Sequence, residues 1–235
     1  FEHNDEVNSY WMSHADARII WGGDETVAKM RSYKSKPRSR EIVFPDRYSM
    51  SVLKADKIID TSRSEMEKIC ENLFNDIYVM NQQACSSPQL FNWVGHKKNI
   101  DKAKDKLWTE FFSYVESRHE LEPIEYMDKY IDLCKSAMLN NNIKKINRTN
   151  NLLYNIELSH FNDNQHLQRG YFGTIHEISI NSIHELSSIV DSRYQTLTYF
   201  GFDRKEIEEF VFLNNLRGID RIVPLGRSMD MDVIW

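Results

Sequence analysis

The spacing of apolar residues along the chain predicts helices and strands in alternation. Across residues 62–75 the apolar side chains fall three or four positions apart, as in a helix with one buried face: Met66, Ile69, Cys70, Leu73 and Phe74. The same spacing predicts helices at residues 100–115, 124–138, 182–190 and 204–216. Short apolar runs predict strands at residues 17–21, 48–53, 77–80, 152–158, 174–180, 196–200 and 221–223. Such repeated units predict an α/β fold, in which helices cover a mixed or parallel sheet.

Cys85 lies in surroundings that differ from those of the other two cysteines. A cysteine is by default a small buried hydrophobe. Cys70 fits that description because it lies on an apolar helix stripe, and Cys134 also falls in a predicted helix. Cys85 is flanked instead by amide and small polar side chains, between a predicted strand and a helix that Pro88 is expected to begin. Such a junction offers backbone N–H groups and can lower a thiol pKa from about 8.5 toward neutrality. From the residues alone, a nucleophile and an ordinary thiol are equally open.

Composition narrows the class of protein. The 235 residues, 41% of them hydrophobic, are enough for one sizeable core and a second small lobe. A net charge of -5 gives no general attraction to nucleic acid or to anionic membranes. No apolar run approaches the length of about 20 residues that spans a bilayer, and the polar N-terminus is unlike a signal peptide. Three widely spaced cysteines predict a reducing, cytoplasmic setting. Because the chain lacks an initial Met and ends in an apolar run, we expect a fragment of a longer protein.

Gly22 and Gly23 lie between a predicted strand and a helix pattern, as in α/β nucleotide-binding layers, although an ordinary loop turn is the default explanation. Phe172 is by default a core aromatic. The histidines show no metal-ligand spacing, and no metal site is predicted. The nearest grouping is expected to be a solvated loop: His160, Asp163 and His166. His176 alternates with apolar neighbours on a predicted strand and is expected to face solvent or a neighbouring strand.

The segment at residues 81–89, Asn-Gln-Gln-Ala-Cys-Ser-Ser-Pro-Gln, resembles the nucleophile segment of the aldehyde dehydrogenase superfamily. Residues 21–27 resemble the family's glycine-containing turn near the cofactor, residues 55–56 with the helix that follows resemble the element before the nucleophile, and residues 171–174 resemble its Phe-Gly step beside the nicotinamide. Three further runs resemble the acyl reductase branch, the LuxC-type long-chain fatty acid reductases of bacterial bioluminescence: residues 46–49, 194–201 and 218–227.

The resemblance implies an aldehyde-dehydrogenase-like catalytic domain together with the remaining edge of a Rossmann-like cofactor domain. Residues 1–60 would be the end of the cofactor domain, 61–216 the catalytic domain and 217–235 a returning strand segment. It further implies that Cys85 is the nucleophile and that the oxyanion or its supporting shell involves Asn81, Gln82 and Ser86. The implied cofactor is NADPH, beside Gly22, Gly23 and Phe172.

The implied reaction is the reduction of a long-chain fatty acyl thioester to a fatty aldehyde, through an acyl-enzyme on Cys85, to supply bioluminescence. The implied partners are an acyl-protein synthetase, an acyl transferase and further copies of the same chain.

Departures from the family pattern leave two alternatives open. The Glu-Leu-Gly-Gly segment that carries the water-activating base of oxidising members is missing, and neither Glu41 nor Asp46 lies in a matching motif. Where many members have an acid that binds the cofactor ribose, this chain has Gly170 and Tyr171. The family's glycine-rich nucleotide-binding half is also missing. An aldehyde or semialdehyde dehydrogenase is the first alternative, and a non-catalytic scaffold domain of a reductase complex is the second.

Overall fold

The computed structural model describes residues 4–230, and the chain divides into two compact units between Arg47 and Tyr48. The sequence analysis placed the strand that begins at Tyr48 in the segment 1–60, whereas its backbone pairs with strands of the larger unit. The functions expected for the segments 1–60, 61–216 and 217–235 stay predictions. Residues 231–235, which include the apolar end of the chain, lie outside the described residues.

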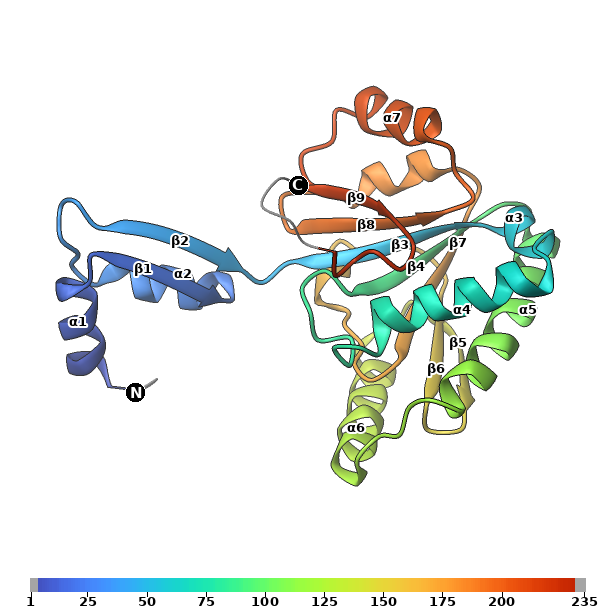
Figure 1. Ribbon diagram of the computed structural model, residues 1–235, viewed down its shortest axis with the longest axis horizontal. Helices are drawn as coiled ribbons and strands as arrows, with labels where there is room; N and C mark the ends of the chain where they lie inside the picture. Colours follow the sequence, from blue (N-terminus) through green and yellow to red (C-terminus); the bar gives the residue numbers. More distant parts are fainter. Residues whose placement is uncertain (1–3, 231–235) are drawn as a thin grey trace. The chain divides into compact units, whose positions relative to one another are not determined.

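The first unit is a parallel pair of strands with two helices (Figure 1). Its elements are α1 (Asp5–His14), β1 (Ala17–Gly22), α2 (Asp24–Ser32) and β2 (Arg40–Pro45). Asn4 caps α1, because its side-chain oxygen accepts a hydrogen bond from the Val7 N–H at 3.1 Å. Ile20 of β1 and Val27 of α2 are buried, and α2 packs against β1. The strand β1 followed by the helix α2 is the arrangement that the sequence predicted, whereas β2 was not predicted.

The second unit is built on one large sheet. Its elements are β3 (Tyr48–Lys54), α3 (Ala55–Ile59), α4 (Arg63–Ile77), β4 (Pro88–Val94), α5 (Lys97–Glu116), α6 (Pro123–Leu139), β5 (Ile143–Thr149), β6 (Leu153–Leu158), η1 (Gln165–Leu167), β7 (Thr174–Ile180), η2 (Ile183–Ser188), β8 (Tyr194–Phe200), α7 (Arg204–Leu213) and β9 (Arg221–Pro224). Within the described residues the strand order is β5-β6-β7-β4-β3-β8-β9, and all neighbours are parallel except β5 and β6. The predicted mixed α/β fold is confirmed.

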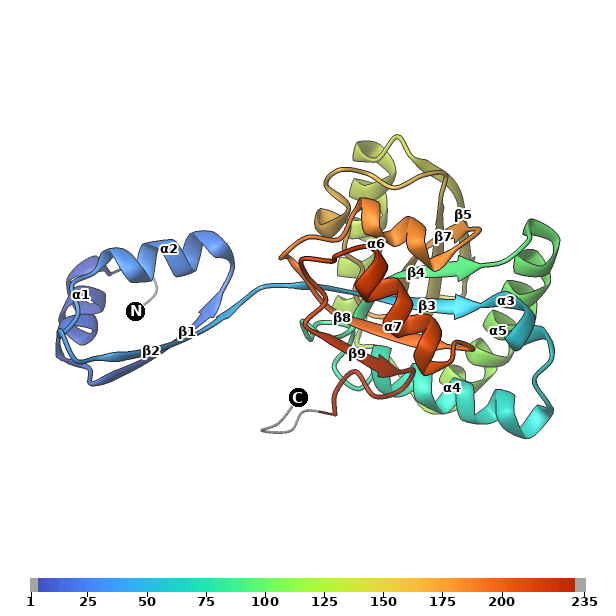
Figure 2. The same cartoon turned by 90° about the horizontal axis from the view of Figure 1, so that it is seen from above.

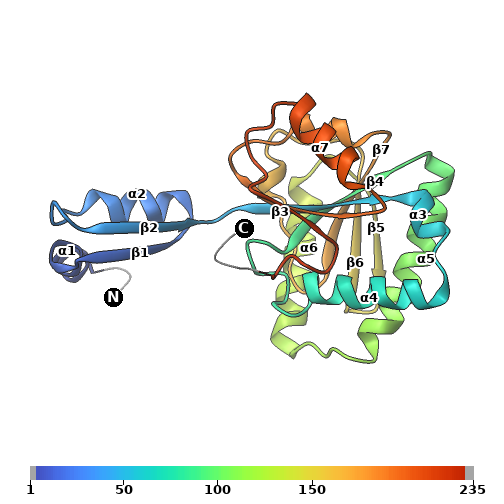
Figure 3. The same ribbon diagram turned by 45° about the horizontal axis from the view of Figure 1, so that its top comes forward.

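Helices cover both faces of this sheet. Met66, Ile69 and Leu73 of α4 enter one apolar core together with residues of α3 and α5, and α3 lies beside α5 (Figure 2). Ile207 and Phe210 of α7 enter the core on the other face. Figure 3 shows α4 and α7 on opposite sides of β3. The strands β3 and β4 are therefore buried on both faces, which explains their lack of polar alternation.

Two expected elements around Cys85 are wrong. The run 77–80 is not a strand: α4 continues to Ile77, and the Tyr78 N–H donates to the Phe74 carbonyl at 2.8 Å as the helix ends. Pro88 does not begin a helix but the strand β4. Proline is tolerated at the first residue of a strand as well as of a helix, so the position of Pro88 could not distinguish a strand from a helix.

Smaller differences concern ends and edges of elements. The helix expected at residues 182–190 is the 3-10 helix η2, and α7 ends at Leu213 rather than at residue 216. The sequence analysis missed β2 and the edge strand β5, whose charged residues hide the alternation of a strand: Arg40, Glu41, Lys144, Lys145 and Arg148. Along the described part of the chain, every helix is too short or too polar to cross a lipid bilayer.

Candidate active site

Cys85 lies in the loop between α4 and β4, and its side chain is half-buried. The Ser49 hydroxyl on β3 donates a hydrogen bond to the Cys85 carbonyl oxygen at 2.6 Å and accepts one from the Thr196 N–H on β8 at 3.1 Å. Because β3 lies in the middle of the sheet, this hydroxyl ties the cysteine backbone to two central strands. Cys85 is therefore at a helix-to-strand connection, not at the expected strand-to-helix junction. The thiolate argument from a helix N-terminus loses its basis.

Gln82 is fully buried and joins the Cys85 loop to two other segments. Its side-chain amide donates to the carbonyls of Pro88 and Thr174, both at 3.0 Å. Its side-chain oxygen accepts from the Gly173 N–H at 3.2 Å. Both amide hydrogens are used within the protein, so the geometry favours a supporting role for Gln82 in the expected oxyanion group.

Asn81 and Phe172 meet through their backbones. The Phe172 N–H donates to the Asn81 carbonyl at 3.1 Å, and the Asn81 side-chain amide donates to Glu125 Oε1 at 3.0 Å. Asn81 and Phe172 have φ angles of 49° and 56°, in the left-handed backbone region that residues other than glycine rarely occupy. A Cβ on the following Gly173 would lie 2.1 Å from the Tyr78 hydroxyl oxygen, so only glycine fits there. The Phe-Gly step is thus packed against the loop that carries Cys85.

Gln89 completes this connection and was missed by the sequence analysis. Its side-chain amide donates to the Gln82 carbonyl at 2.9 Å, and its side-chain oxygen accepts from the Gly170 N–H at 2.8 Å. Gln89 is 2% exposed, on a strand that is otherwise largely apolar. An amide side chain in such an apolar run, here Gln89 as well as Asn92, is the signal that could have identified it.

Ser86 and Asp76 bring the end of the described chain to the same region. The buried Ser86 hydroxyl lies 3.4 Å from Met229 Sδ. The Asp76 carboxylate accepts hydrogen bonds from the backbone N–H groups of Gly226 at 2.7 Å and Ser228 at 2.9 Å. Burial raises the pKa of Asp76 to about 6, although the two N–H groups favour the charged form. The sequence analysis missed Asp76, although its position three residues after Leu73 on the apolar stripe of α4 was a usable signal.

The other two cysteines lie in different environments. Cys70 is buried on α4, as expected, and burial raises the pKa of its thiol to about 12. Cys134 is exposed on α6. Neither residue has the polar loop surroundings of Cys85, so the comparison supports Cys85 as the candidate nucleophile.

Gly22 and Gly23 lie in the first unit, at the turn from β1 to α2. Gly22 has a φ of 156°, and a Cβ there would come within 2.9 Å of the Thr26 side chain. Gly23 is the N-cap of α2 and, having no side chain, makes no capping hydrogen bond to the helix. The turn is therefore shaped by the glycines themselves.

The histidines are dispersed. His160 is exposed with the neighbouring Asp163, and His166 Nε2 lies 2.9 Å from Arg193 Nη1. His176 does not face solvent: it is fully buried in β7, and burial lowers its pKa to about 4. Its strand is covered on both faces, which the sequence analysis did not foresee.

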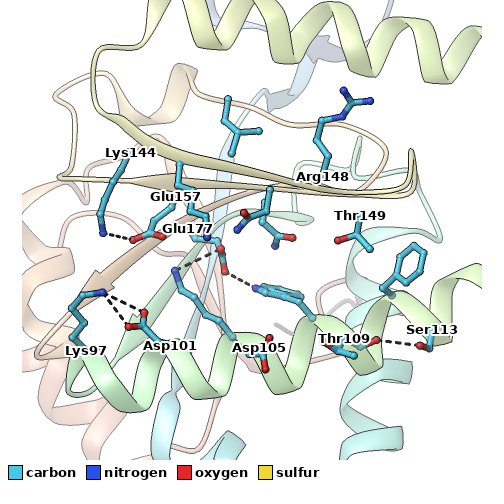
Figure 4. Close-up of a pocket in the computed structure, with 17 residues that line it drawn as sticks. Lys97, Asp101, Asp105, Thr109, Ser113, Lys144, Arg148, Thr149, Glu157 and Glu177 are labelled. Carbon is cyan, nitrogen blue, oxygen red and sulfur yellow. Dashed lines mark hydrogen bonds and ion pairs between the residues drawn. The ribbon is translucent and has the colours of Figure 1, made fainter.

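A large cavity lies away from this loop, between α5 and the strands β5 to β7 (Figure 4). Its volume is about 900 Å³. Ion pairs such as Lys144–Glu157 and Lys97–Asp101 border it, and the buried Glu177 accepts from the Trp108 indole at 2.7 Å. Cys85 is not among its lining residues, so size alone does not identify the site of chemistry here.

The fold is that of the aldehyde dehydrogenases. A 1-pyrroline-5-carboxylate dehydrogenase from Thermus thermophilus superposes with a TM-score of 0.62 at 11% identity, over 94% of this chain and 45% of that one. A methylmalonate-semialdehyde dehydrogenase from Oceanimonas doudoroffii gives a TM-score of 0.60 at 13% identity, over 99% and 48%. A Sinorhizobium meliloti protein of the same type, solved in complex with NAD, gives 0.62 at 11% identity, over 95% and 48%. The chain spans about half the length of these solved relatives.

Residues 1–234 match the family described as acyl-CoA reductase (LuxC), and the chain belongs to that family. A long-chain acyl-protein thioester reductase from Aliivibrio fischeri is 33% identical over 84 residues, which are 36% of this chain and 16% of that protein. The resemblance found in the sequence, to the superfamily and to its acyl reductase branch, is confirmed.

Proposed function

We propose that the complete protein reduces a long-chain fatty acyl thioester to a fatty aldehyde with NADPH, through an acyl-enzyme on Cys85. The observation that carries the proposal is the position of Cys85 in a member of the acyl-CoA reductase family. The cysteine lies half-buried on a loop whose backbone is held by Ser49, Gln82 and Gln89. A nucleophile needs this combination of access and a fixed position.

In the first step, the Cys85 thiolate attacks the carbonyl carbon of the acyl thioester. A carbon–sulfur bond forms to Cys85, the bond to the donor sulfur breaks, and the donor leaves as a thiolate that keeps the electron pair of that bond. Backbone N–H groups of the turn at Cys85 are proposed to stabilise the oxyanion, and losing one such donor typically costs about 3 kcal/mol. Ser49 and Gln82 keep the turn in place through the bonds described above.

In the second step, the bond between the acyl carbon and Cys85 breaks after reduction. Its electron pair returns to the sulfur, and the aldehyde leaves. The family's water-activating Glu-Leu-Gly-Gly segment is missing from this chain, which suits a reductase because hydrolysis of the acyl-enzyme would waste the acyl group.

The turn from β1 to α2 supports the proposal of a nicotinamide nucleotide. Among the described residues, a Cβ on Gly23 would meet no atom within 4 Å, so space is open before the N-terminus of α2. Backbone N–H groups at such a helix end favour a phosphate. We therefore keep Gly22 and Gly23 as proposed cofactor contacts and Phe172 as the proposed nicotinamide contact. When bound, NADPH supplies the hydride that reduces the acyl carbon.

By the same resemblance, the complete protein is proposed to act with an acyl-protein synthetase and an acyl transferase, as a homo-oligomer, and to supply aldehyde for luminescence. The choice between these partners and an acyl-CoA donor is made by the labelling experiment below, because each donor can be supplied separately.

The test uses the complete protein with radioactive long-chain acyl donor. Wild type and Cys134→Ser are expected to carry protein-bound label that hydroxylamine removes, and Cys85→Ser is expected to carry none. Cys134 is the matched control because it is exposed on a helix. Label on the Cys85 variant would refute the proposal. Formation of fatty acid from aldehyde in water would favour an oxidising dehydrogenase, and failure of the complete protein to bind NADPH would favour a scaffold.

A further inference from the structure

Lys129 is a buried lysine whose three N–H donors are all directed at backbone carbonyls. It lies on α6 with 1% of its surface exposed. Its ammonium donates to the carbonyls of Asn151 at 2.9 Å, Phe172 at 2.6 Å and Leu152. The Tyr154 ring centroid lies 4.2 Å from the same nitrogen. Three acceptors and one aromatic face favour the charged ammonium group, whereas burial and the nearby Arg148 lower the pKa of Lys129 to about 6.

The Phe172 carbonyl is the contact that matters for the proposed site. Phe172 stands at a φ of 56°, and its N–H donates to the carbonyl of Asn81. The next residue, Gly173, donates to the Gln82 side chain. One peptide segment is therefore held by Lys129 on one side and holds the Cys85 loop on the other.

A second residue of α6 reaches the same loop. Glu125 lies one turn before Lys129, and its Oε1 accepts from the Asn81 side-chain amide at 3.0 Å. Residues four apart lie on one face of a helix. The contacts form a closed circuit from Lys129 through Phe172 and Asn81 to Glu125 and back along α6.

We infer that Glu125 and Lys129 are positioning residues, which act together through Asn81 and Phe172 to set the place of the Cys85 loop. The inference rests on the proposed function for the role of Cys85, but not for the geometry. Without the Lys129 side chain, the carbonyl of Phe172 loses this donor, and the left-handed turn that supports Asn81 is released. Misplacement of a reacting atom by 1 Å can cost about a hundredfold in rate.

The test compares Lys129→Met with Lys135→Met in the complete protein. Lys135 lies on the same helix but is largely exposed, with its nitrogen 4.0 Å from Asp132. Two rates are measured. The first is the transfer of the acyl group from the donor, and the second is the alkylation of each cysteine by iodoacetamide, which mass spectrometry monitors. We expect Lys129→Met to slow acyl transfer by about tenfold to a hundredfold with little change in KM, because geometry and not binding is lost. Alkylation of Cys85 is expected to rise severalfold, since its loop is released. Lys135→Met should behave as wild type in both.

Cys70 reports whether the variant is folded, because it is 2% exposed. If Cys70 stays protected while both Cys85 rates equal those of wild type, the inference is wrong. If Cys70 becomes reactive in Lys129→Met, Glu125→Leu decides the question, since Glu125 is only half-buried and breaks the circuit from its other end. Unchanged Cys85 rates in a folded Glu125→Leu variant would then overturn the inference. Alkylation needs no acyl donor, so the positioning role can be tested even if the proposed reaction is wrong.

Discussion

The Ser49 hydroxyl donates a hydrogen bond of 2.6 Å to the backbone carbonyl of Cys85. The same oxygen accepts the Thr196 N–H, so one small side chain joins the candidate nucleophile to two strands of the sheet. Removing it takes the Ser49 hydroxyl away from the Thr196 N–H and from the Cys85 carbonyl.

We expect Ser49→Ala to lower the free energy of unfolding by about 1–3 kcal/mol, the usual cost of leaving buried polar groups unsatisfied. Ser51→Ala is the matched control. Ser51 lies on the same strand, equally buried, and its hydroxyl has no hydrogen-bond partner among the described residues. Its loss should be neutral or slightly stabilising. Urea unfolding of both variants checks the prediction, and equal effects would contradict it.

Gln82→Glu is expected to be strongly destabilising although it barely changes the side-chain shape. The carboxylate would keep an acceptor for Gly173 but would place a charge against the carbonyls of Pro88 and Thr174. Burying such an unpaired charge costs about 3–5 kcal/mol. The exposed neighbour supplies the control, since Gln83→Glu should change stability little. A Gln82→Glu variant as stable as Gln83→Glu would show that the loop is not held as described.

Asp76 makes stability fall as pH rises. Its pKa is raised by burial from 3.8 to about 6, so folding favours the protonated carboxyl. Relative to Asp76→Asn, wild type should lose up to about 3 kcal/mol of unfolding free energy between about pH 4 and pH 6. Urea unfolding at several pH values measures this difference. A difference that does not depend on pH would mean that Asp76 does not titrate abnormally.

His176 has the opposite effect on the pH dependence of stability, which it makes rise as pH rises. Burial lowers its pKa from 6.5 to about 4, so folding favours the neutral ring, and stability is lost as pH falls through that interval. His176→Leu removes the titrating ring and should be less sensitive to acid than wild type, by up to about 3 kcal/mol at pH 4. Thermal or urea unfolding of wild type, Asp76→Asn and His176→Leu over the same pH range separates the two opposed effects. Parallel pH profiles for wild type and His176→Leu would disprove this assignment.

The sequence predicted the fold class because helical periodicity is strong where one face of a helix is buried. The stripe from Met66 to Phe74 identified α4 without ambiguity. Periodicity failed where strands are covered on both faces, as in β4, and where an edge strand is charged, as in β5. A continuous apolar run has no period to read.

The candidate site shows the same limit. A short polar segment drew attention to Cys85, and the resemblance placed it in a family. Two of the residues that support its loop could not be found that way, because Ser49 and Lys129 lie far from Cys85 along the chain. A polar residue among apolar ones was the local sign, and it was present at Asp76, Gln89 and Lys129.

The contacts around Cys85 also bear on how the protein is made. The Ser49 hydroxyl accepts the Thr196 N–H, which lies 147 positions later in the sequence, and the Asp76 carboxylate accepts the Ser228 N–H, 152 positions later. During translation, the loop with its thiol therefore leaves the ribosome long before its anchors exist. Because contacts between residues that are distant in the sequence form late in folding, the nascent chain lacks these two contacts until residues 196 and 228 have been made.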